Sequence, residues 1–383
     1  MRFAAEKQSV AAFVQLRMMR TRFIGKFWGL VVALLWGAAL PAAEFPAARM
    51  FQTVEVAPGV YAFVAAATSG PIPSGNVVAI VGDDGVLVVD SGRFPTLAKR
   101  MIAEIRAKTD RPVRYLVHTH WHLDHIASDE TFRAAFPHMA IVTTDFTRRK
   151  IAEKQVPYLK GLVETDRGYV EYLQGAVAKG KRRDGSAMSE ELKRYLTSQV
   201  ADIQLESAEL AGVAAVIPDL TFDHELRIHL GKREVRIAFL GKGNTAGDTV
   251  VFVPDAKVAV AGDLLVSPTP YGYGCHPAAW IATLDVLMAS DATVIVPGHG
   301  PVMRDWSYAK KVSALLAEVR RQVEAQVKQG ATLEQTQERV DLSSQKKLFA
   351  GDSFDQGAAF DDYFVRSAVE RAYQEAKGEL AEE

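Results

Sequence analysis

The sequence predicts an α/β fold in a single domain, and three features of the chain lead to that prediction. Short strand patterns are concentrated in residues 51–90 and 226–262, with helical patterns between and after them. No internal repeat and no low-complexity linker separates the two groups. Of the 383 residues, 48% are apolar, which is enough to build a large buried core. We therefore expect the strands and helices to share one domain.

The first half of the domain is predicted to begin as a series of short strands. Four apolar or alternating runs, separated by turn sequences, predict strands at residues 51–56, 60–65, 76–81 and 85–90. Residues 95–108 then change to helical spacing, and Pro95 stands near the start, where its fixed φ suits the first helical turn. A further apolar run at residues 113–119 predicts a buried strand.

The second half combines a helical region with a second group of strands. Residues 145 to about 212 are rich in Lys, Arg, Glu and Tyr at helical spacing, and we expect them to form a helical insertion. Strand patterns that predict a second sheet follow at residues 226–230, 234–240, 248–253 and 257–262. We expect a helix at 280–289, a strand at 293–296, and C-terminal helices within 307–383 that begin with a long amphipathic helix at 307–329.

The first 43 residues have the pattern of a signal peptide. Basic residues precede the apolar run 27–43, and small residues end that run at Ala43. These 17 residues are fewer than the roughly 20 that a membrane-spanning helix needs. We expect cleavage after Ala43 and a mature domain of residues 44–383 without a stable membrane span, a retained anchor being the alternative. The predicted location is periplasmic or secreted.

Charge and cysteine content exclude several classes of protein. The 45 basic and 46 acidic residues give a net charge of −1, so no basic excess is available for binding nucleic acid. Cys275 is the one cysteine, which excludes an intrachain disulfide and a thiolate zinc cage. Any metal site must therefore consist of His, Asp and Glu. The expected partner is a small-molecule substrate, and the oligomeric state stays open.

Residues 118–125 read HTHWHLDH and hold four of the nine histidines and one aspartate. Imidazole and carboxylate groups at this spacing typically converge on a metal ion. His120 and His122 are separated by one residue, so both imidazoles point the same way on an extended backbone. Asp124 and His125 follow after a turn and can face a second point nearby. The cluster therefore predicts two adjacent metal sites on the loop after a strand.

Two polar side chains farther along the chain fit the same metal centre. Asp263 ends a predicted strand at a Gly-Asp pair, and His299 stands between two glycines after the strand 293–296. A neighbouring glycine lets another group approach closely. Asp263 alone would more often be an ordinary turn residue, but because the histidine cluster is present, we expect Asp263 and His299 to be metal ligands. His118 lies on the buried strand before the cluster, and we expect it to support the ligands or the core rather than to bind metal.

The motifs HWHLDH, GD and GHG, in this order, resemble those of the metallo-β-lactamase superfamily over most of residues 50–305. The resemblance implies an αβ/βα four-layer sandwich that holds one or two metal ions, usually zinc, at the edge of its sheets. It implies that Asp90, in LVVDSG, is a structural hydrogen-bonding residue. The ligands it implies are His120 and His122 for the first metal, Asp124, His125 and His299 for the second, and Asp263 as a bridge.

One position departs from the family pattern. The family places a third histidine for the first metal where this chain has Asn244, in GKGNTAGD. An amide oxygen is a poorer zinc donor than an imidazole, so we expect the first site to be weakened. Three outcomes stay open: two metals with Asn244 as a weak ligand or replaced by water, one metal held by Asp124, His125 and His299, or no catalysis. A purely conformational role for Asn244 in its turn is a further alternative.

The resemblance implies hydrolysis of an ester, thioester, lactone or β-lactam bond. In that interpretation a zinc-bound hydroxide attacks the carbonyl, and Asp124 both binds metal and orients the hydroxide. Candidate substrate contacts are Tyr271, Tyr273 and His276, whereas the neighbouring Cys275 has no adjacent base that would make it a nucleophile. Two alternatives stay open: an iron-dependent redox enzyme on the same scaffold, and a non-catalytic periplasmic binding protein that retains the fold.

Overall fold

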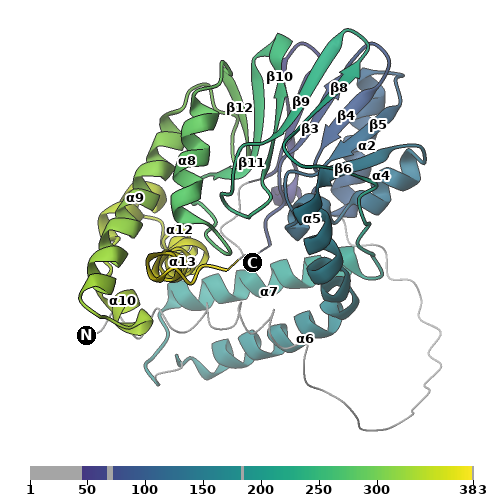
Figure 1. The fold of residues 1–383 in the computed structure, drawn as a ribbon. Coiled ribbons are helices and arrows are strands. Elements are labelled where there is room, and N and C mark those ends of the chain that lie inside the picture. The colour runs from purple at the N-terminus through teal and green to yellow at the C-terminus, as the bar shows by residue number, and fades with distance from the viewer. Residues whose placement is uncertain (1–44, 67–71, 183–184, 382–383) are drawn as a thin grey trace, which may run out of the picture.

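The structure, a computed structural model, describes residues 45–66, 72–182 and 185–381. Two β-sheets pack face to face, and helices cover the outer face of each sheet (Figure 1). The predicted signal peptide and its cleavage position lie outside the described residues. Within the three described ranges, none of the helices is long and apolar enough to cross a membrane.

The first sheet has seven strands that follow one another in chain order. They are β1 (Gln52–Ala57), β2 (Val60–Val64), β3 (Val77–Val81), β4 (Val86–Val89), β5 (Val113–Val117), β6 (Ala140–Thr144) and β7 (Leu220–Phe222). The pairs up to β4 are antiparallel, and the remaining pairs are parallel. Parallel neighbours need crossover connections. Helix α2 (Pro95–Lys108), which has the predicted bounds, connects β4 to β5. Helices α3 (Leu123–Ile126) and α4 (Asp129–Ala135) connect β5 to β6.

The second sheet has five strands in the order β12-β11-β10-β9-β8. Their bounds are β8 (Glu225–Leu230), β9 (Arg233–Phe239), β10 (Thr249–Val253), β11 (Val258–Val266) and β12 (Val294–His299). All pairs are antiparallel except β11 with β12, which are joined by the crossover helix α8 (Pro277–Met288). The 3-10 turn η5 (Pro254–Ala256) links β10 to β11.

Strand β4 shows why the strands are apolar at nearly every position. Val86 and Val88 belong to the core between the first sheet and its helices, whereas Leu87 and Val89 belong to the core between the two sheets. Successive side chains of a strand point to opposite faces, so a strand buried on both faces needs apolar residues throughout. A third core joins the second sheet to its own helices. These three cores define the expected αβ/βα four-layer sandwich.

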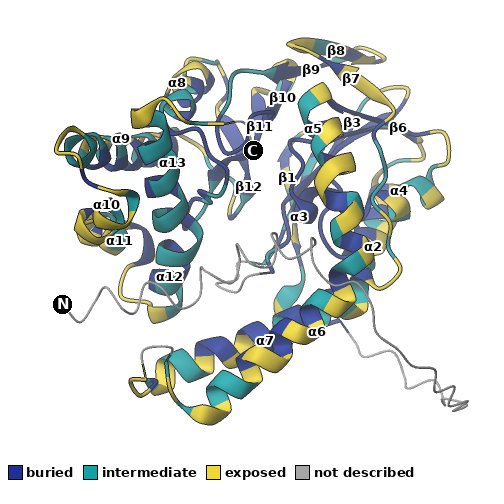
Figure 2. Cartoon of the chain, turned by 60° about the horizontal axis from the view of Figure 1, so that its bottom comes forward, coloured by how far each residue is buried: buried dark blue, intermediate teal, exposed yellow. Residues whose placement is uncertain are grey.

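The region expected to form a helical insertion contains α5 (Asp145–Lys150), the π-helical turn η4 (Ile151–Gln155), α6 (Val156–Lys179) and α7 (Glu190–Leu210). Helices α6 and α7 form a hairpin that projects from the sandwich (Figure 2). Their buried residues face each other and α2, and their outer faces are exposed. The base of the hairpin therefore lies against the helical layer of the first sheet.

Six helical segments follow β12 within the described residues 300–381. They are α9 (Ser307–Lys328), α10 (Leu333–Arg339), α11 (Ser343–Ala350), α12 (Phe354–Ala359), the π-helical turn η6 (Phe360–Val365) and α13 (Arg366–Lys377). Helices α9 and α13 pack with α8 on the outer face of the second sheet. A 3-10 turn, η3 (Ala47–Arg49), precedes the first strand.

Candidate metal centre

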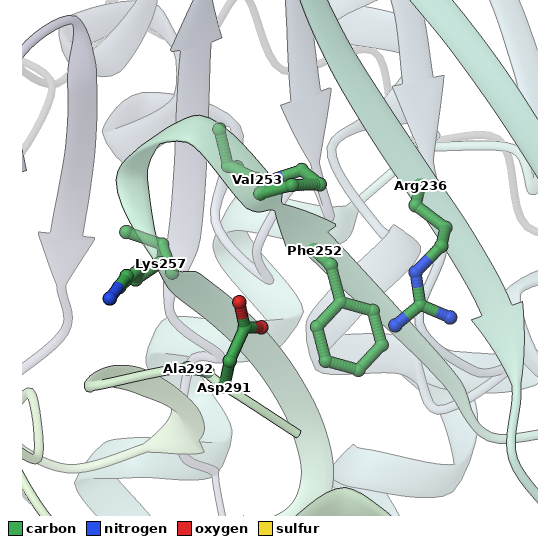
Figure 3. A pocket seen from close by; sticks show the side chains of 8 residues that line it. Arg236, Phe252, Val253, Lys257, Asp291 and Ala292 are labelled. Atoms are coloured by element: carbon green, nitrogen blue, oxygen red, sulfur yellow. The ribbon is translucent and has the colours of Figure 1, made fainter.

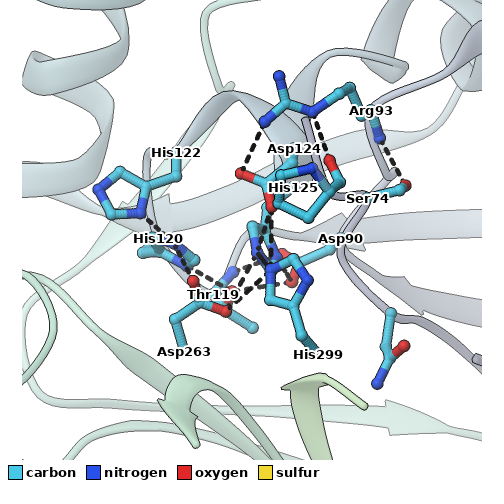
Figure 4. A network of polar contacts seen from close by, with 12 residues as sticks. Ser74, Asp90, Arg93, Thr119, His120, His122, Asp124, His125, Asp263 and His299 are labelled. Atoms are coloured by element: carbon cyan, nitrogen blue, oxygen red, sulfur yellow. Dashed lines mark hydrogen bonds and ion pairs between the residues drawn. The ribbon is translucent and has the colours of Figure 1, made fainter. Parts of the chain in front are cut away.

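Segments from both sheets bring the predicted ligands to one edge of the sandwich (Figure 4). Asp90 follows β4, and the segment 118–122 follows β5. Asp124 and His125 lie in the short helix α3, so a turn separates them from the preceding histidines as predicted. Asp263 comes from β11 and His299 from the end of β12.

The prediction that Asp263 ends its strand is wrong, because β11 continues to Val266. The pairing of β11 with β12 is irregular on both sides of Gly262, whose φ is +54°. Glycine adopts this left-handed conformation without steric cost, so the strand bends and resumes instead of stopping. A Cβ atom on Gly298 of β12 would lie 2.0 Å from Asp263 Oδ1, so this close approach also requires glycine.

Four donor atoms converge on the second predicted metal position. Asp124, His125 and His299 form one group of possible ligands, and Asp263 reaches both histidines. The distances are 2.9 Å from His299 Nε2 to Asp124 Oδ2, 3.2 Å from His125 Nε2 to Asp263 Oδ1, 3.3 Å between the two Nε2 atoms, and 3.5 Å from His125 Nε2 to Asp124 Oδ2. Two imidazoles and two carboxylates suit a divalent metal.

The first predicted position is less complete. His120 forms a group with His125 and Asp263, and its Nε2 lies 3.5 Å from Asp263 Oδ2 and 2.9 Å from His122 Nδ1. Asn244 is fully buried, and its Nδ2 donates a 2.5 Å hydrogen bond to the backbone oxygen of Tyr271. Its Oδ1 has no hydrogen-bond partner in the part of the chain that the structure describes. The side-chain nitrogen of Asn244 therefore binds the backbone of Tyr271, whereas its side-chain oxygen is available to bind a metal ion.

Buried hydrogen bonds orient the ligand rings. Asp90 accepts hydrogen bonds from Thr119 N at 2.7 Å and Thr119 Oγ1 at 2.8 Å, and its Oδ2 lies 2.8 Å from His125 Nδ1. This leaves His125 Nε2 to face the metal position. His118 Nε2 lies 3.0 Å from Asp129, and His118 belongs to neither group of possible ligands, so its supporting role stays a prediction. Such partners fix the tautomer and the orientation of ligating histidines.

The electrostatics favour ionised carboxylates and a neutral His122, whereas His125 must release a proton to a metal ion, because Asp263 and Asp124 outweigh burial and raise the pKa of His125 well above its usual value. Burial opposes charge on both Asp124 and Asp263, but His125 and His299 outweigh it and hold the pKa of each carboxyl below its usual range. Burial, followed by repulsion from His120, lowers the pKa of His122 to about 3. The carboxylates are therefore ionised and His122 is neutral near pH 7, as metal binding requires.

An unsatisfied buried atom supports the fit of a metal to this donor set. Among the described residues, Asp263 Oδ1 has no hydrogen-bond partner, although it faces His125 Nε2 at 3.2 Å and His299 Nε2 at 3.5 Å. A buried carboxylate oxygen without a partner costs free energy unless another group satisfies it. A cation among these atoms would satisfy the carboxylate and both imidazoles together.

The candidate substrate contacts lie at different places around the centre. The ring of Tyr271 packs edge-on against His122, with 5.4 Å between centroids, and burial raises its pKa. Tyr273 lies next to Tyr271, 6.4 Å between ring centroids. His276 is the N-cap residue of α8, and its backbone N–H bonds Gly243 O at 2.9 Å. Cys275 is a buried free thiol. Tyr271 thus contacts a predicted ligand directly.

Three further buried charged residues near the centre were not predicted from the sequence. Arg93 forms ion pairs with Asp124 and with Glu206 of α7, and Asp248 bonds Thr245 in the turn that carries Asn244. Burial raises the pKa of Asp248 to about 6. Arg93 follows LVVDSG directly, and this position was the one available signal. Glu206 has no such signal, because its partner lies 113 positions away.

A small cavity elsewhere in the molecule is remote from these residues. It has a volume of about 130 Å³ and is lined by Arg236, Phe252, Lys257 and Asp291, among others (Figure 3). It lies where β10 ends and β11 begins, whereas the metal centre lies beside the start of β10 and near the far end of β11. It is therefore separate from the candidate metal centre.

Known proteins resemble this chain in sequence or in fold. A linear primary-alkylsulfatase from Pseudomonas sp. (strain ATCC 19151) is 26% identical over 231 residues, which are 58% of this chain and 40% of that protein. The chain thus spans less than half the length of this relative. The metallo-β-lactamase from Pontibacter korlensis is 19% identical, with a TM-score of 0.49 over 70% of this chain and 99% of that chain. The DIM-1 metallo-β-lactamase is 16% identical, with a TM-score of 0.47 over 70% and 97%.

The match to a family model covers the metal centre itself. The model described as the metallo-beta-lactamase superfamily matches residues 71–299, more than half of the chain. The matched region includes the histidine cluster, Asp263 and His299. The match supports the predicted class, a metal-dependent hydrolase. The chain belongs to the metallo-β-lactamase superfamily.

Proposed function

We propose that the protein is a zinc-dependent hydrolase that cleaves an ester, thioester, lactone or β-lactam bond. The observation that carries the proposal is the convergence of Asp124, His125, Asp263 and His299, with donor atoms 2.9 to 3.5 Å apart. Zinc is bound by imidazole nitrogens and carboxylate oxygens of this kind. Since a metal-binding protein need not be an enzyme, the proposal must be tested by activity as well as by metal content.

The metal would be held by these four residues, with His120 and His122 beside it. A bound divalent zinc supplies Lewis-acid activation of water and of the substrate oxygen. Asp90 keeps His125 Nε2 directed at the centre through the 2.8 Å contact to Nδ1. Asp124 directs Oδ2 to His299 at 2.9 Å and Oδ1 toward Arg93 at 3.6 Å. Its ionised carboxylate can therefore bind the metal and orient a water molecule by accepting its proton in a hydrogen bond.

We propose that one zinc ion per chain binds tightly, at the position of Asp124, His125, Asp263 and His299. The neighbouring position has two imidazoles, and its third residue, Asn244, already donates through Nδ2 to Tyr271 O. A neutral amide oxygen binds zinc less strongly than an imidazole. A second ion would therefore bind there more weakly than the first.

A sulfate ester is a second candidate substrate. The observation that favours it is the 26% identity to a linear primary-alkylsulfatase over 231 residues, which include the greater part of this chain. The activity test therefore needs a panel of substrates that contains a primary alkyl sulfate, a β-lactam, a lactone and a thioester.

The test compares the wild-type protein with Asp124→Ala, assayed on this panel with added zinc. We expect the wild type to hydrolyse at least one substrate class and the variant to lose at least 100-fold in kcat/KM, on the order of the loss of a catalytic metal interaction. Circular dichroism and urea unfolding should show that the fold is retained. The exposed His138→Ala, remote from the centre, is the matched control and should keep wild-type turnover.

Three results would contradict the proposal. Wild-type turnover by Asp124→Ala would remove the proposed role of this carboxylate. Iron rather than zinc in the natively purified protein, together with a redox activity, would favour the redox enzyme. Zinc binding without hydrolysis of any panel member would favour a binding protein that retains the fold.

A further inference from the structure

Helix α7 of the hairpin places a carboxylate against the back of the metal centre. Glu206 is completely buried and forms an ion pair and a hydrogen bond with Nη1 of Arg93. Arg93 is itself 8% exposed, and its Nη2 lies 3.6 Å from Asp124 Oδ1. A buried carboxylate of the helical hairpin thus reaches a proposed metal ligand through a single arginine (Figure 4 shows Arg93 and Asp124).

Arg93 also holds the segment that packs over the ligands. Its Nε donates to Pro73 O at 2.5 Å, and its backbone N donates to Ser74 Oγ at 3.2 Å. The next residue, Gly75, donates its N–H to Asp124 O at 3.1 Å. A Cβ on Gly75 would lie 2.5 Å from the ring of His125. Arg93 therefore fixes both the side chain of Asp124 and the backbone packed against it.

The two oxygens of Asp124 have different partners. Oδ1 faces Arg93, whereas Oδ2 faces His299 and His125. An unpaired buried guanidinium would attract Asp124 strongly in a low-dielectric environment and compete with the metal for its charge. Because Glu206 forms the closer ion pair with Arg93, the arginine can orient Asp124 without withdrawing it from the metal position.

We propose that Glu206 is a positioning residue, through which helix α7 sets the affinity of the metal centre by way of Arg93 and Asp124. The inference rests on the proposed metal site of Asp124, His125, Asp263 and His299. Outer partners of metal ligands typically change metal affinity by about 10- to 100-fold when they are removed. The hairpin would then be part of the metal centre and not only an appendage of the fold.

A second carboxylate on the same helix provides a matched control. Glu209 accepts hydrogen bonds from Thr96 N at 3.0 Å and Thr96 Oγ1 at 2.8 Å. Glu209 attaches α7 to the start of α2, as Glu206 attaches α7 to Arg93. The partner of Glu209, Thr96, is uncharged and forms no ion pair with Asp124. A purely structural role of Glu206 predicts the same effect for both glutamates.

The experiment measures zinc affinity by chelator competition and the visible spectrum of the cobalt-substituted protein, for wild type, Glu206→Gln and Glu209→Gln. We expect Glu206→Gln to raise the zinc Kd about 10- to 100-fold and to change the cobalt ligand-field bands. Glu209→Gln should keep the wild-type Kd and spectrum, even where urea unfolding shows reduced stability. Equal Kd values for all three proteins, or equal increases in both variants, would overturn the proposal.

A neutral double variant keeps the test decisive if Glu206→Gln does not fold. Replacing a buried ion pair by apolar side chains often preserves stability, so Arg93→Met with Glu206→Met should fold. Since Asp124 then loses the partner of Oδ1, we expect a raised zinc Kd in a stable protein; a wild-type Kd would overturn the proposal. If the wild-type chain binds neither zinc nor cobalt, both the proposed function and this inference are overturned. If the wild type binds zinc tightly and the variants have the same zinc Kd, only the inference is overturned.

Discussion

Asp90 combines an uncommon backbone conformation with two roles in the metal centre. Its φ is 59°, a left-handed value that few residues other than glycine adopt, although Asp and Asn tolerate it. This conformation brings one carboxylate to both Thr119 and His125. The side chain and the backbone at this position are therefore constrained by the same site.

We predict that Asp90→Asn raises the zinc Kd about 10- to 100-fold and lowers the stability by about 1 to 3 kcal/mol, because the amide replaces one of two buried hydrogen-bond acceptors by a donor. The amide preserves the shape and the tolerance of positive φ, but it removes the negative charge that supports His125. Chelator competition measures the Kd, and urea unfolding measures the stability.

Asp90→Ala separates the effect of the carboxylate charge on metal affinity from the effect of the backbone conformation on stability. Alanine is strained at positive φ, so this variant should show the same loss of affinity and an additional loss of about 1 kcal/mol or more in stability. The exposed Asp84→Asn should change neither quantity. An unaltered Kd in Asp90→Asn would show that the charge of Asp90 does not support the site.

At the scale of elements, the α6–α7 hairpin contains glycines with different functions. A Cβ on Gly168, inside α6, would meet no atom within 4 Å. Gly180 ends the same helix with a φ of +61°, and a Cβ there would lie 3.8 Å from Lys193 Cε. Space is available at both positions, so only the backbone conformation distinguishes them.

We predict that Gly168→Ala stabilises the protein by about 0.5 to 1 kcal/mol, because alanine loses less conformational entropy than glycine in a helix interior. Gly180→Ala should destabilise it, since alanine is unfavourable in the left-handed cap conformation. Urea unfolding followed by circular dichroism measures both changes. Destabilisation by Gly168→Ala would mean that α6 has a packing partner at this position.

At the scale of the whole molecule, the hairpin contacts the C-terminal helices. Tyr195 of α7 packs edge-on against Phe354 of α12, with 6.4 Å between centroids, and Arg194 pairs with Asp355 at 3.4 Å. Asp362 lies in η6, which follows α12. Burial, followed by repulsion from Asp361, raises the pKa of Asp362 to about 7, although Arg366 and Lys346 oppose the shift.

We predict that Asp362→Asn is more stable than the wild type at pH 8 and equally stable at pH 4. Between the ordinary pKa of 3.8 and about 7, the folded protein keeps a proton that the unfolded chain releases. Wild-type stability therefore falls as pH rises through this window, by at most about 1.4 kcal/mol per pH unit from this group. Urea unfolding from pH 4 to pH 8 measures the difference.

The exposed Asp352→Asn is the control for this pH series, because its carboxylate is 92% exposed beside Lys347. Its stability difference from the wild type should stay constant between pH 5 and pH 8. A constant difference for Asp362→Asn as well would show that Asp362 titrates as an ordinary surface carboxyl.

Local patterns were sufficient to predict most of the elements and many of the proposed ligands. Residues 95–108 were expected to be helical and form α2, because helical periodicity and Pro95 act within the segment itself. The strand carrying Asp263 was predicted too short, since its continuation to Val266 depends on pairing with β12. The pattern of HTHWHLDH was informative because its donors are close in sequence and need only a turn to converge.

The sequence by itself determined the continuous apolar runs that allow strands such as β4 to be buried on both faces, and the residue types that can bind a metal. Only the tertiary structure decided which donors meet: His299 against Asp124 at 2.9 Å, and the nitrogen of Asn244 against Tyr271. It also decided that Glu206 reaches Arg93 across 113 positions. The physical reason is the separation along the sequence: backbone preferences act between residues a few positions apart, whereas these contacts exist only after both sheets and the hairpin have packed.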